Sequence, residues 1–175
     1  MDLQLRDKAV IVTGGAKGIG AAAVESFAAE GAKVAISGRS PTEGESLSKK
    51  VSGIFIEAEL AEESACRRVV DETLNAFGRI DILVNDAAYN KWIPFHDLDG
   101  LTGSEWSKML AINLTGPMMC IKAVAVAMKR QGQGRVVNIS SVAGLFPGGS
   151  SIPYAVSKAG LIHLTRCMSV GLAPE

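Results

Sequence analysis

Tyr154 and Lys158 are the residues of this chain whose types and spacing most clearly suggest chemistry. They stand four positions apart, so on a helix their side chains lie on the same face. An ammonium group held near a phenol favours the phenolate and lowers the phenol pKa by Coulomb attraction. A free tyrosine titrates near about 10, and a lowered pKa would let it exchange a proton with a substrate oxygen. Many surface helices carry this spacing without a function, so the rest of the chain has to support the interpretation.

The composition indicates one ordinary globular domain over residues 1–175. The chain has 175 residues, 47% of them apolar, which is enough apolar material for a core. Its 18 basic and 18 acidic side chains balance, so net charge provides no argument for binding nucleic acid or an anionic membrane surface. Neither kind of partner is expected.

Cysteine usage and the N-terminal residues favour a reduced, cytoplasmic protein. Cys66, Cys120 and Cys167 are odd in number, lie far apart and form no Cys-x-x-Cys pair. We therefore expect core thiols, with neither a disulfide framework nor a metal site. His96 and His163 have no cysteine or carboxylate at ligand spacing. The charged N-terminus argues against a signal peptide, and no stretch approaches the roughly 20 apolar residues of a membrane span.

Five short apolar runs alternate with helical patterns along the chain. The runs predicted to be strands are residues 9–13, 33–37, 54–56, 80–84 and 135–139. The segments with helical periodicity are residues 21–30, 62–77, 104–131 and 154–172, and the polar segment between the second and third strands is a further candidate. This alternation predicts an α/β fold with a doubly wound parallel sheet. We expect it to be of the Rossmann type, with strand order 3-2-1-4-5.

A glycine-rich loop follows the first predicted strand. Glycines stand at positions 14, 15, 18 and 20, with Lys17 and Ile19 between them. Glycine permits a tight turn and close backbone approach, so main-chain amides at the helix N-terminus can meet a pyrophosphate. The spacing is Gly14-x-x-x-Gly18-x-Gly20 and departs from G-x-G-x-x-G. A structural turn is the alternative, but four glycines in this context favour dinucleotide binding.

The end of the second strand indicates which dinucleotide is bound. An acidic residue there would hydrogen-bond the ribose hydroxyl of NAD, but Arg39 occupies this region and no carboxylate follows until Glu43. Arg39, together with Lys17, could receive a 2′-phosphate through charge-assisted hydrogen bonds. The alternative is a pair of solvated surface cations. We predict NADP as the cofactor, with NAD as the alternative.

The chain resembles the short-chain dehydrogenase/reductase family over essentially its whole length. The family's Thr-Gly-x-x-x-Gly-x-Gly pattern matches residues 13–20, and Asn113, Ser141, Tyr154 and Lys158 match its Asn-Ser-Tyr-Lys set. Ser141 is preferred to its neighbour because it stands thirteen residues before the tyrosine, as in the family pattern.

The resemblance implies a role for each member of this set. Tyr154 would be the general acid in reduction and the general base in oxidation, and Ser141 would hydrogen-bond the substrate carbonyl oxygen. Lys158 would lower the tyrosine pKa and hold the nicotinamide ribose. Asn113 would hold a water in the proton relay, the alternative being a mid-helix polar residue bonded to backbone. The nicotinamide would carry the hydride, while the protein supplies orientation and electrostatics.

The resemblance also implies a set of cofactor contacts and reveals departures from the family. The expected contacts are Gly14, Lys17, Gly18, Ile19, Gly20, Arg39, Glu59, Leu60, Asn85, Ala87, Tyr154 and Lys158. Glu59 replaces the usual aspartate that meets the adenine. Asp86 replaces an asparagine and exchanges the donors of an amide for a charge, and Ala88 loses the backbone freedom of a glycine.

Family members usually continue beyond the point where this chain stops, with further strands, a substrate lid and part of an oligomer contact. We therefore expect the later strands to be absent, the fifth strand to form an exposed apolar edge, and a full-length relative to be a homo-oligomer.

Two functions stay open. One is an NADP(H)-dependent oxidoreductase acting on a small-molecule carbonyl or alcohol, and the other is a truncated, inactive nucleotide-binding partner domain. An extended-type epimerase or dehydratase is weaker, because the glycine spacing argues against it.

Residues near the predicted site are candidates for a substrate pocket. Leu145 and Phe146 lie between the catalytic serine and tyrosine, and Trp92, Pro94 and Phe95 lie in the loop after the fourth strand. Substrates bind near the carboxyl ends of strands in such sheets. Packing is the alternative role for these side chains, and substrate identity is beyond the sequence.

Overall fold

The strands form one parallel sheet, which the computed structural model of the chain describes together with its helices for residues 3–173. β1 (Ala9–Thr13) lies in the middle, and all five of its residues are buried. It pairs in parallel with β2 (Lys33–Gly38) on one side and with β4 (Ile82–Asn85) on the other. β3 (Ile54–Glu57) and β5 (Arg135–Asn138) complete the order β3-β2-β1-β4-β5. The predicted fold class and strand order are confirmed.

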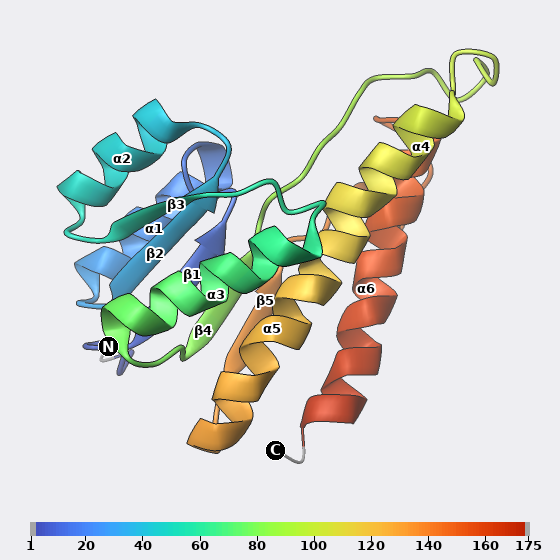
Figure 1. Ribbon diagram of the computed structural model, residues 1–175. Coiled ribbons are helices and arrows are strands. Elements are labelled where there is room, and N and C mark those ends of the chain that lie inside the picture. The colour runs from blue at the N-terminus through green and yellow to red at the C-terminus, as the bar shows by residue number, and fades with distance from the viewer. Residues whose placement is uncertain (1–2, 174–175) are drawn as a thin grey trace.

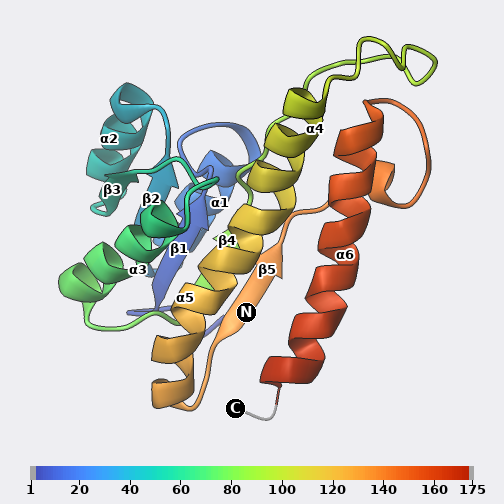
Figure 2. The ribbon, with the colours of Figure 1, turned by 45° about the vertical axis from the view of Figure 1, so that its right-hand side comes forward.

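Helices cover both faces of this sheet (Figure 1). Successive side chains of a strand point to opposite faces, so Val10 and Val12 pack toward α1 (Gly18–Ala29) and α2 (Pro41–Lys50). Ile11 faces the opposite layer, which contains α3 (Glu63–Phe77) and α5 (Gly116–Gln131). α6 (Ile152–Leu172) runs alongside α5 in both ribbon views (Figures 1 and 2).

The long predicted helix is continuous but not uniform. It begins as α4 (Gly103–Leu110), passes through a π-helical segment (Ala111–Thr115) and continues as α5. In the π-helical segment the Gly116 N–H bonds to the Ala111 carbonyl five residues earlier. Such segments are rare and frequently occur at functional sites, and this one contains Asn113.

The same helix corrects the expectation about membrane spans. By length and composition alone, residues Gly103–Gln131 would suffice to cross a membrane, with a mean hydropathy of 1.6 over the most apolar window. However, 44% of that window is buried inside the protein, and Cys120, Ile121 and Val124 belong to the core cluster beneath α3. One face of the helix therefore packs in the chain's own core.

The three cysteines are free, but they do not share one environment. Cys66 and Cys120 are buried, on α3 and α5, whereas Cys167 is exposed on α6. The prediction of core thiols was wrong for Cys167. The helical pattern of residues 154–172 did not indicate which face of the last helix would be covered.

A hollow of the described chain lies along β5. It has a volume of about 580 Å³ and is lined by α5, β5 and α6, including Met128, Gly134 and Leu172. β5 is the edge strand of the described sheet, and Val137 is 45% exposed. This hollow follows from the open edge and contains none of the predicted site residues.

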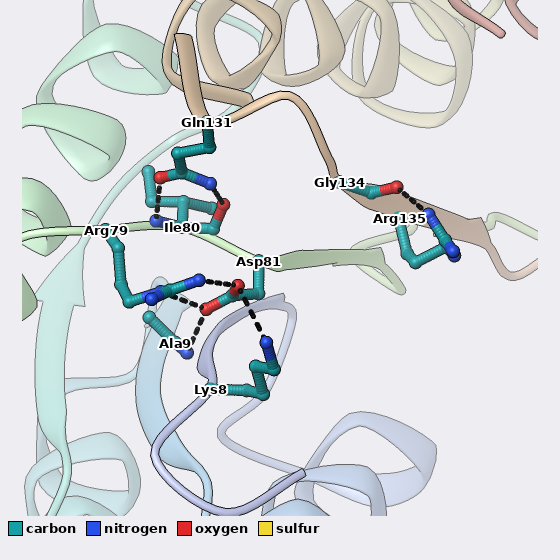
Figure 3. Close-up of polar contacts among 8 residues, drawn as sticks. All are labelled: Lys8, Ala9, Arg79, Ile80, Asp81, Gln131, Gly134 and Arg135. Carbon is teal, nitrogen blue, oxygen red and sulfur yellow. Dashed lines mark hydrogen bonds and ion pairs between the residues drawn. The ribbon is translucent and has the colours of Figure 1, made fainter. Parts of the chain in front are cut away.

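Asp81 connects the amino-terminal ends of β1 and β4 (Figure 3). Its carboxylate accepts a hydrogen bond from the Ala9 backbone N–H at 2.9 Å and two from Arg79 at 2.8 and 2.6 Å, and Lys8 lies at 3.7 Å. Burial by itself would raise the pKa of the Asp81 carboxyl, but these donors and cations outweigh it and hold the pKa below its usual range. Asp81 is therefore ionised and bonded in the folded protein.

We expect Asp81→Asn to lower the free energy of unfolding by about 2 kcal/mol at neutral pH, because hydrogen bonds to a charged group are lost. The pKa of Asp81 is lower in the folded state, so this contribution is complete above about pH 4, the ordinary value, and disappears as the pH falls through the folded-state pKa. Urea denaturation between pH 7 and pH 2 measures it. Asp71→Asn, an exposed change on α3, is the control and should stay within about 0.5 kcal/mol. Equal effects of the two substitutions would contradict this role.

Candidate active site

The loops after β1 and β4 are joined at the carboxyl end of the sheet. The Thr13 hydroxyl oxygen accepts hydrogen bonds from the backbone N–H groups of Asp86 at 3.2 Å and Ala87 at 3.3 Å. Thr13 is buried, so this contact is shielded from water. It holds the glycine loop against the segment that follows the fourth strand.

A cavity of about 300 Å³ opens between these loops. Six predicted cofactor contacts line it, namely Gly14, Lys17, Arg39, Glu59, Leu60 and Ala87. They come from the ends of four different strands, because the carboxyl ends of parallel strands meet at one edge of the sheet. Residues not predicted also line the cavity, namely Ala16, Gly38, Ser40, Ala58, Asp86, Ala88 and Ile112.

Glycine is required at two points of the loop by close backbone contacts. A Cβ at Gly14 would lie 2.7 Å from the Cα and N atoms of Ala87, and Gly14 has a φ of 69°. A Cβ at Gly20 would lie 2.5 Å from the Gly14 carbonyl oxygen. Gly18 also has a positive φ, of 57°, but open space surrounds it. The loop can therefore bring its backbone close to a ligand while staying packed on the β4 segment.

Several predicted cofactor contacts lie outside the cavity lining. Gly18, Ile19 and Gly20 form the first residues of α1, and Ile19 is 66% exposed. Asn85 turns toward β5, where its Nδ2 donates to Asn138 Oδ1 at 2.9 Å. The Oδ1 atom of Asn85 is buried and has no partner among the described residues, so one acceptor is left open at the end of β4.

The Tyr154–Lys158 pair lies on α6, as the spacing predicted. The ammonium nitrogen of Lys158 is 5.8 Å from the centroid of the Tyr154 ring and donates a hydrogen bond to the Ile139 carbonyl at 2.7 Å. Lys158 is only 3% exposed. The bond to Ile139 fixes the charge at the end of β5 and next to the tyrosine.

Asp86 is the charged group that opposes Lys158 at this end of the sheet. Burial lowers the pKa of the Lys158 ammonium, and the charge of Asp86 counteracts the effect. Burial likewise raises the pKa of the Asp86 carboxyl, while a hydrogen bond from the Gly20 N–H and the charge of Lys158 counteract it. Asp86 stands where the family pattern has an asparagine. Its carboxylate thus lies between the first turn of α1 and Lys158.

The two neighbouring serines have different roles in the structure. Ser140 donates its hydroxyl to the Lys158 carbonyl at 3.0 Å, whereas the Ser141 oxygen accepts from the Ala143 N–H at 3.1 Å. The hydroxyl hydrogen of Ser141 stays available among the described residues. Gly144 brings this segment close to α6, because a Cβ there would lie 2.7 Å from the Lys158 carbonyl carbon. The choice of Ser141 stays a prediction, and the close approach at Gly144 is a packing feature that the sequence did not indicate.

Asn113 is fully buried in the π-helical segment. Its side-chain oxygen accepts from the Tyr89 N–H at 2.7 Å, and its Nδ2 donates to the Tyr89 carbonyl at 2.8 Å and to Ser157 at 3.1 Å. Ser157 in turn donates to the Tyr154 carbonyl at 2.7 Å. The side chain of Asn113 therefore bonds to backbone, as its alternative interpretation had it, and connects the β4 loop to the beginning of α6. Both donors of its Nδ2 are used, whereas its oxygen accepts one bond and has a second lone pair.

The candidate pocket residues are largely on the surface. Leu145 and Phe146 are 64% and 67% exposed, and Trp92 is 65% exposed. Pro94 and Phe95 are half-buried. Leu145 and Phe146 follow the short 3-10 helix (Val142–Gly144) that Ser141 caps, so they place an uncovered apolar surface next to the catalytic candidates.

We expect Gly14→Ala to destabilise the chain far more than Gly18→Ala. Both residues have a positive φ, so both substitutions carry a backbone cost of about 1–2 kcal/mol. Only the Gly14 substitution also drives a Cβ into the Ala87 backbone, which adds about 1–3 kcal/mol. Chemical denaturation of the two variants measures the difference. Equal stabilities would show that the two loops are not packed as described.

Asn113→Ala should lower the free energy of unfolding by about 3 kcal/mol, because it leaves the backbone N–H and carbonyl of Tyr89 without their partners. Thr115→Ala is the matched control, since Thr115 is exposed in the same π-helical segment, and it should change stability by less than about 0.5 kcal/mol. Thermal and urea denaturation compare them. A neutral Asn113→Ala variant would contradict the bridging role.

Comparison with known proteins agrees with this geometry. The family model described as short chain dehydrogenase matches residues 8–175. The chain is 39% identical over 166 residues to the granaticin polyketide synthase putative ketoacyl reductase 2 of Streptomyces violaceoruber, covering 94% of this chain and 67% of that protein. It is 38% identical over 177 residues to a probable galactose dehydrogenase of Rhizobium meliloti (strain 1021), covering 98% and 68%.

A mammalian protein is similar over the same region. The chain is 40% identical over 182 residues to dehydrogenase/reductase SDR family member 4 of Rattus norvegicus, covering 98% of this chain and 62% of that protein. The chain thus spans about two thirds of the length of the three relatives. The family match over nearly the whole chain, together with the parallel sheet and the glycine loop after β1, shows that the chain belongs to the short-chain dehydrogenase/reductase family of oxidoreductases.

Proposed function

We propose that the chain is an NADP(H)-dependent oxidoreductase that interconverts a ketone or aldehyde and the corresponding alcohol. The observation that carries this proposal is the burial of Lys158 beside Tyr154, with its ammonium bonded to the end of β5. A buried cation is costly unless it has partners, and here it lies against the one phenol expected to exchange a proton.

The catalytic candidates divide the proton chemistry among themselves. Tyr154 would give its proton to the substrate oxygen in reduction and take it back in oxidation. Lys158 would stabilise the negative charge that develops on the tyrosine oxygen. Ser141, whose hydroxyl hydrogen is available, would donate to the same substrate oxygen. Asn113 would act indirectly, by positioning Tyr89 and, through Ser157, the beginning of α6.

The cavity suits a dinucleotide. Gly14 lines the cavity without a side chain, and the buried Asn85 Oδ1 at the end of β4 has no partner among the described residues. Lys17 and Arg39 line the same cavity and provide positive charge for a 2′-phosphate. A nicotinamide cofactor would supply or accept the hydride, and the residues above would bind its adenosine half and its phosphates.

A second candidate function is a nucleotide-binding partner domain without turnover. The observation that favours it is the exposure of Val142, Leu145 and Phe146 next to Ser141, since a substrate held there would stay open to water. Both candidates bind the cofactor, so turnover distinguishes them.

The proposed oxidoreductase is also expected to lie in the cytoplasm and to assemble into homo-oligomers.

We expect purified protein to oxidise NADPH in the presence of at least one ketone of a chemically varied panel, and Tyr154→Phe to lower the rate by about 100-fold or more, the usual contribution of general acid–base catalysis. Loss of reduced-cofactor absorbance measures it. The chain has two tyrosines, and the phenol of Tyr89 bonds to Glu105 at 3.1 Å, so Tyr89→Phe is the matched control and should keep most of the activity.

The outcome separates the two functions. Cofactor binding with no turnover above the Tyr154→Phe variant on any substrate would reject the enzyme and favour the partner domain. Equal losses for the two tyrosine variants would reject Tyr154 as the proton donor while leaving an oxidoreductase in place.

A further inference from the structure

Each of the two cations at the cavity forms an ion pair with a carboxylate. The Lys17 ammonium lies 2.6 Å from the Glu43 carboxylate, and an Arg39 guanidinium nitrogen lies 3.3 Å from the Glu59 carboxylate. Lys17, Arg39 and Glu59 line the cavity, whereas Glu43 stands behind Lys17 on the first turn of α2. A ligand in the cavity would therefore meet Lys17 before it met Glu43.

We propose that Glu43 is a specificity-determining residue, which competes with the 2′-phosphate of the cofactor for Lys17 and so reduces the preference for NADP(H) over NAD(H). The inference rests on the proposed function, because it takes a dinucleotide as the ligand of this cavity. It concerns the discrimination between the two forms of that ligand, which is a separate property from binding or turnover.

The charges and exposure of the pair make such competition effective. The hydrogen bond from Lys17 lowers the pKa of the Glu43 carboxyl, so the carboxylate is ionised at neutral pH. Lys17 and Glu43 are 63% and 46% exposed, and exposed ion pairs are weak and readily exchanged. A phosphate can therefore take the ammonium, but it has to displace or share a carboxylate at 2.6 Å, and it also approaches a second negative charge.

An unphosphorylated ribose would not experience the same competition. A hydroxyl group carries no charge to repel Glu43 and does not need the whole ammonium. The presence of Glu43 thus lowers the affinity for the phosphorylated ligand selectively. Arg39 and Glu59 form a second pair of the same kind, but Glu59 itself lines the cavity, so its substitution would change direct ligand contacts as well.

Calorimetric titration of the full chain with adenosine 2′,5′-bisphosphate and adenosine 5′-monophosphate tests this inference. We expect Glu43→Gln to bind the bisphosphate about two- to fivefold more tightly, as the removal of an exposed ion pair allows, and to bind the monophosphate as before. The gain should shrink with added salt, because salt screens exposed charges. Glu45→Gln, the same charge change on the exposed surface of α2, is the control and should produce a smaller effect.

A double substitution confirms that the effect passes through Lys17. In a Lys17→Met background, Glu43→Gln should no longer tighten bisphosphate binding, as expected for two residues that act as a pair. Both variants concern exposed side chains, so the folded state should be retained, and far-ultraviolet circular dichroism checks this.

The outcomes separate this inference from the proposed cofactor. If wild type prefers the bisphosphate and Glu43→Gln binds it no more tightly, the inference about Glu43 is overturned and NADP stands. If wild type shows no preference but Glu43→Gln gains one, the inference holds and the NADP preference of the natural chain fails. If neither protein prefers the bisphosphate and Glu43→Gln binds it no more tightly than wild type, both fall. Weaker monophosphate binding by Glu43→Gln would also overturn the inference, because Glu43 would then contact the ribose directly.

Discussion

The buried ammonium of Lys158 is the constraint on which the candidate site depends. Removing a lysine charge from water is costly, and in this chain the cost is offset by the Ile139 carbonyl and by the charge of Asp86. The bond to Ile139 anchors α6 on the end of β5. Gly144 permits the segment with Ser141 to approach the same turn of the helix. The side chain and the backbone carbonyl of Lys158 thereby join β5 and the serine segment to the helix that carries Tyr154.

Acidic residues serve different purposes at the two ends of the sheet. At the amino end, Asp81 receives bonds from Arg79 and from the Ala9 backbone, so it stabilises strands and lies far from the cavity. At the carboxyl end, Asp86 lines the cavity and bonds to the Gly20 N–H. This division agrees with the general behaviour of parallel α/β sheets, in which ligands bind beyond the carboxyl ends of the strands.

Helix α5 and its π-helical segment connect stability with function. Its apolar face belongs to the core beneath α3, which explains a composition apolar enough to suit a membrane. The irregular segment puts Asn113 at a depth where its amide can bond to both backbone groups of Tyr89. Through Ser157, the same amide also connects the β4 loop to α6.

The sequence by itself determined the alternation of strands and helices, the glycine loop after β1 and the helical placement of Tyr154 and Lys158, since periodicity, glycine spacing and i,i+4 geometry are local properties. Only the tertiary structure decided that Asn113 bonds to Tyr89, that Asp86 opposes Lys158, that Glu43 engages Lys17 and that Cys167 is exposed. These features depend on how loops and helices far apart in the chain come together. The physical reason is that a side chain's partner across the fold is set by packing and burial, and neither is encoded in the spacing of neighbouring residues.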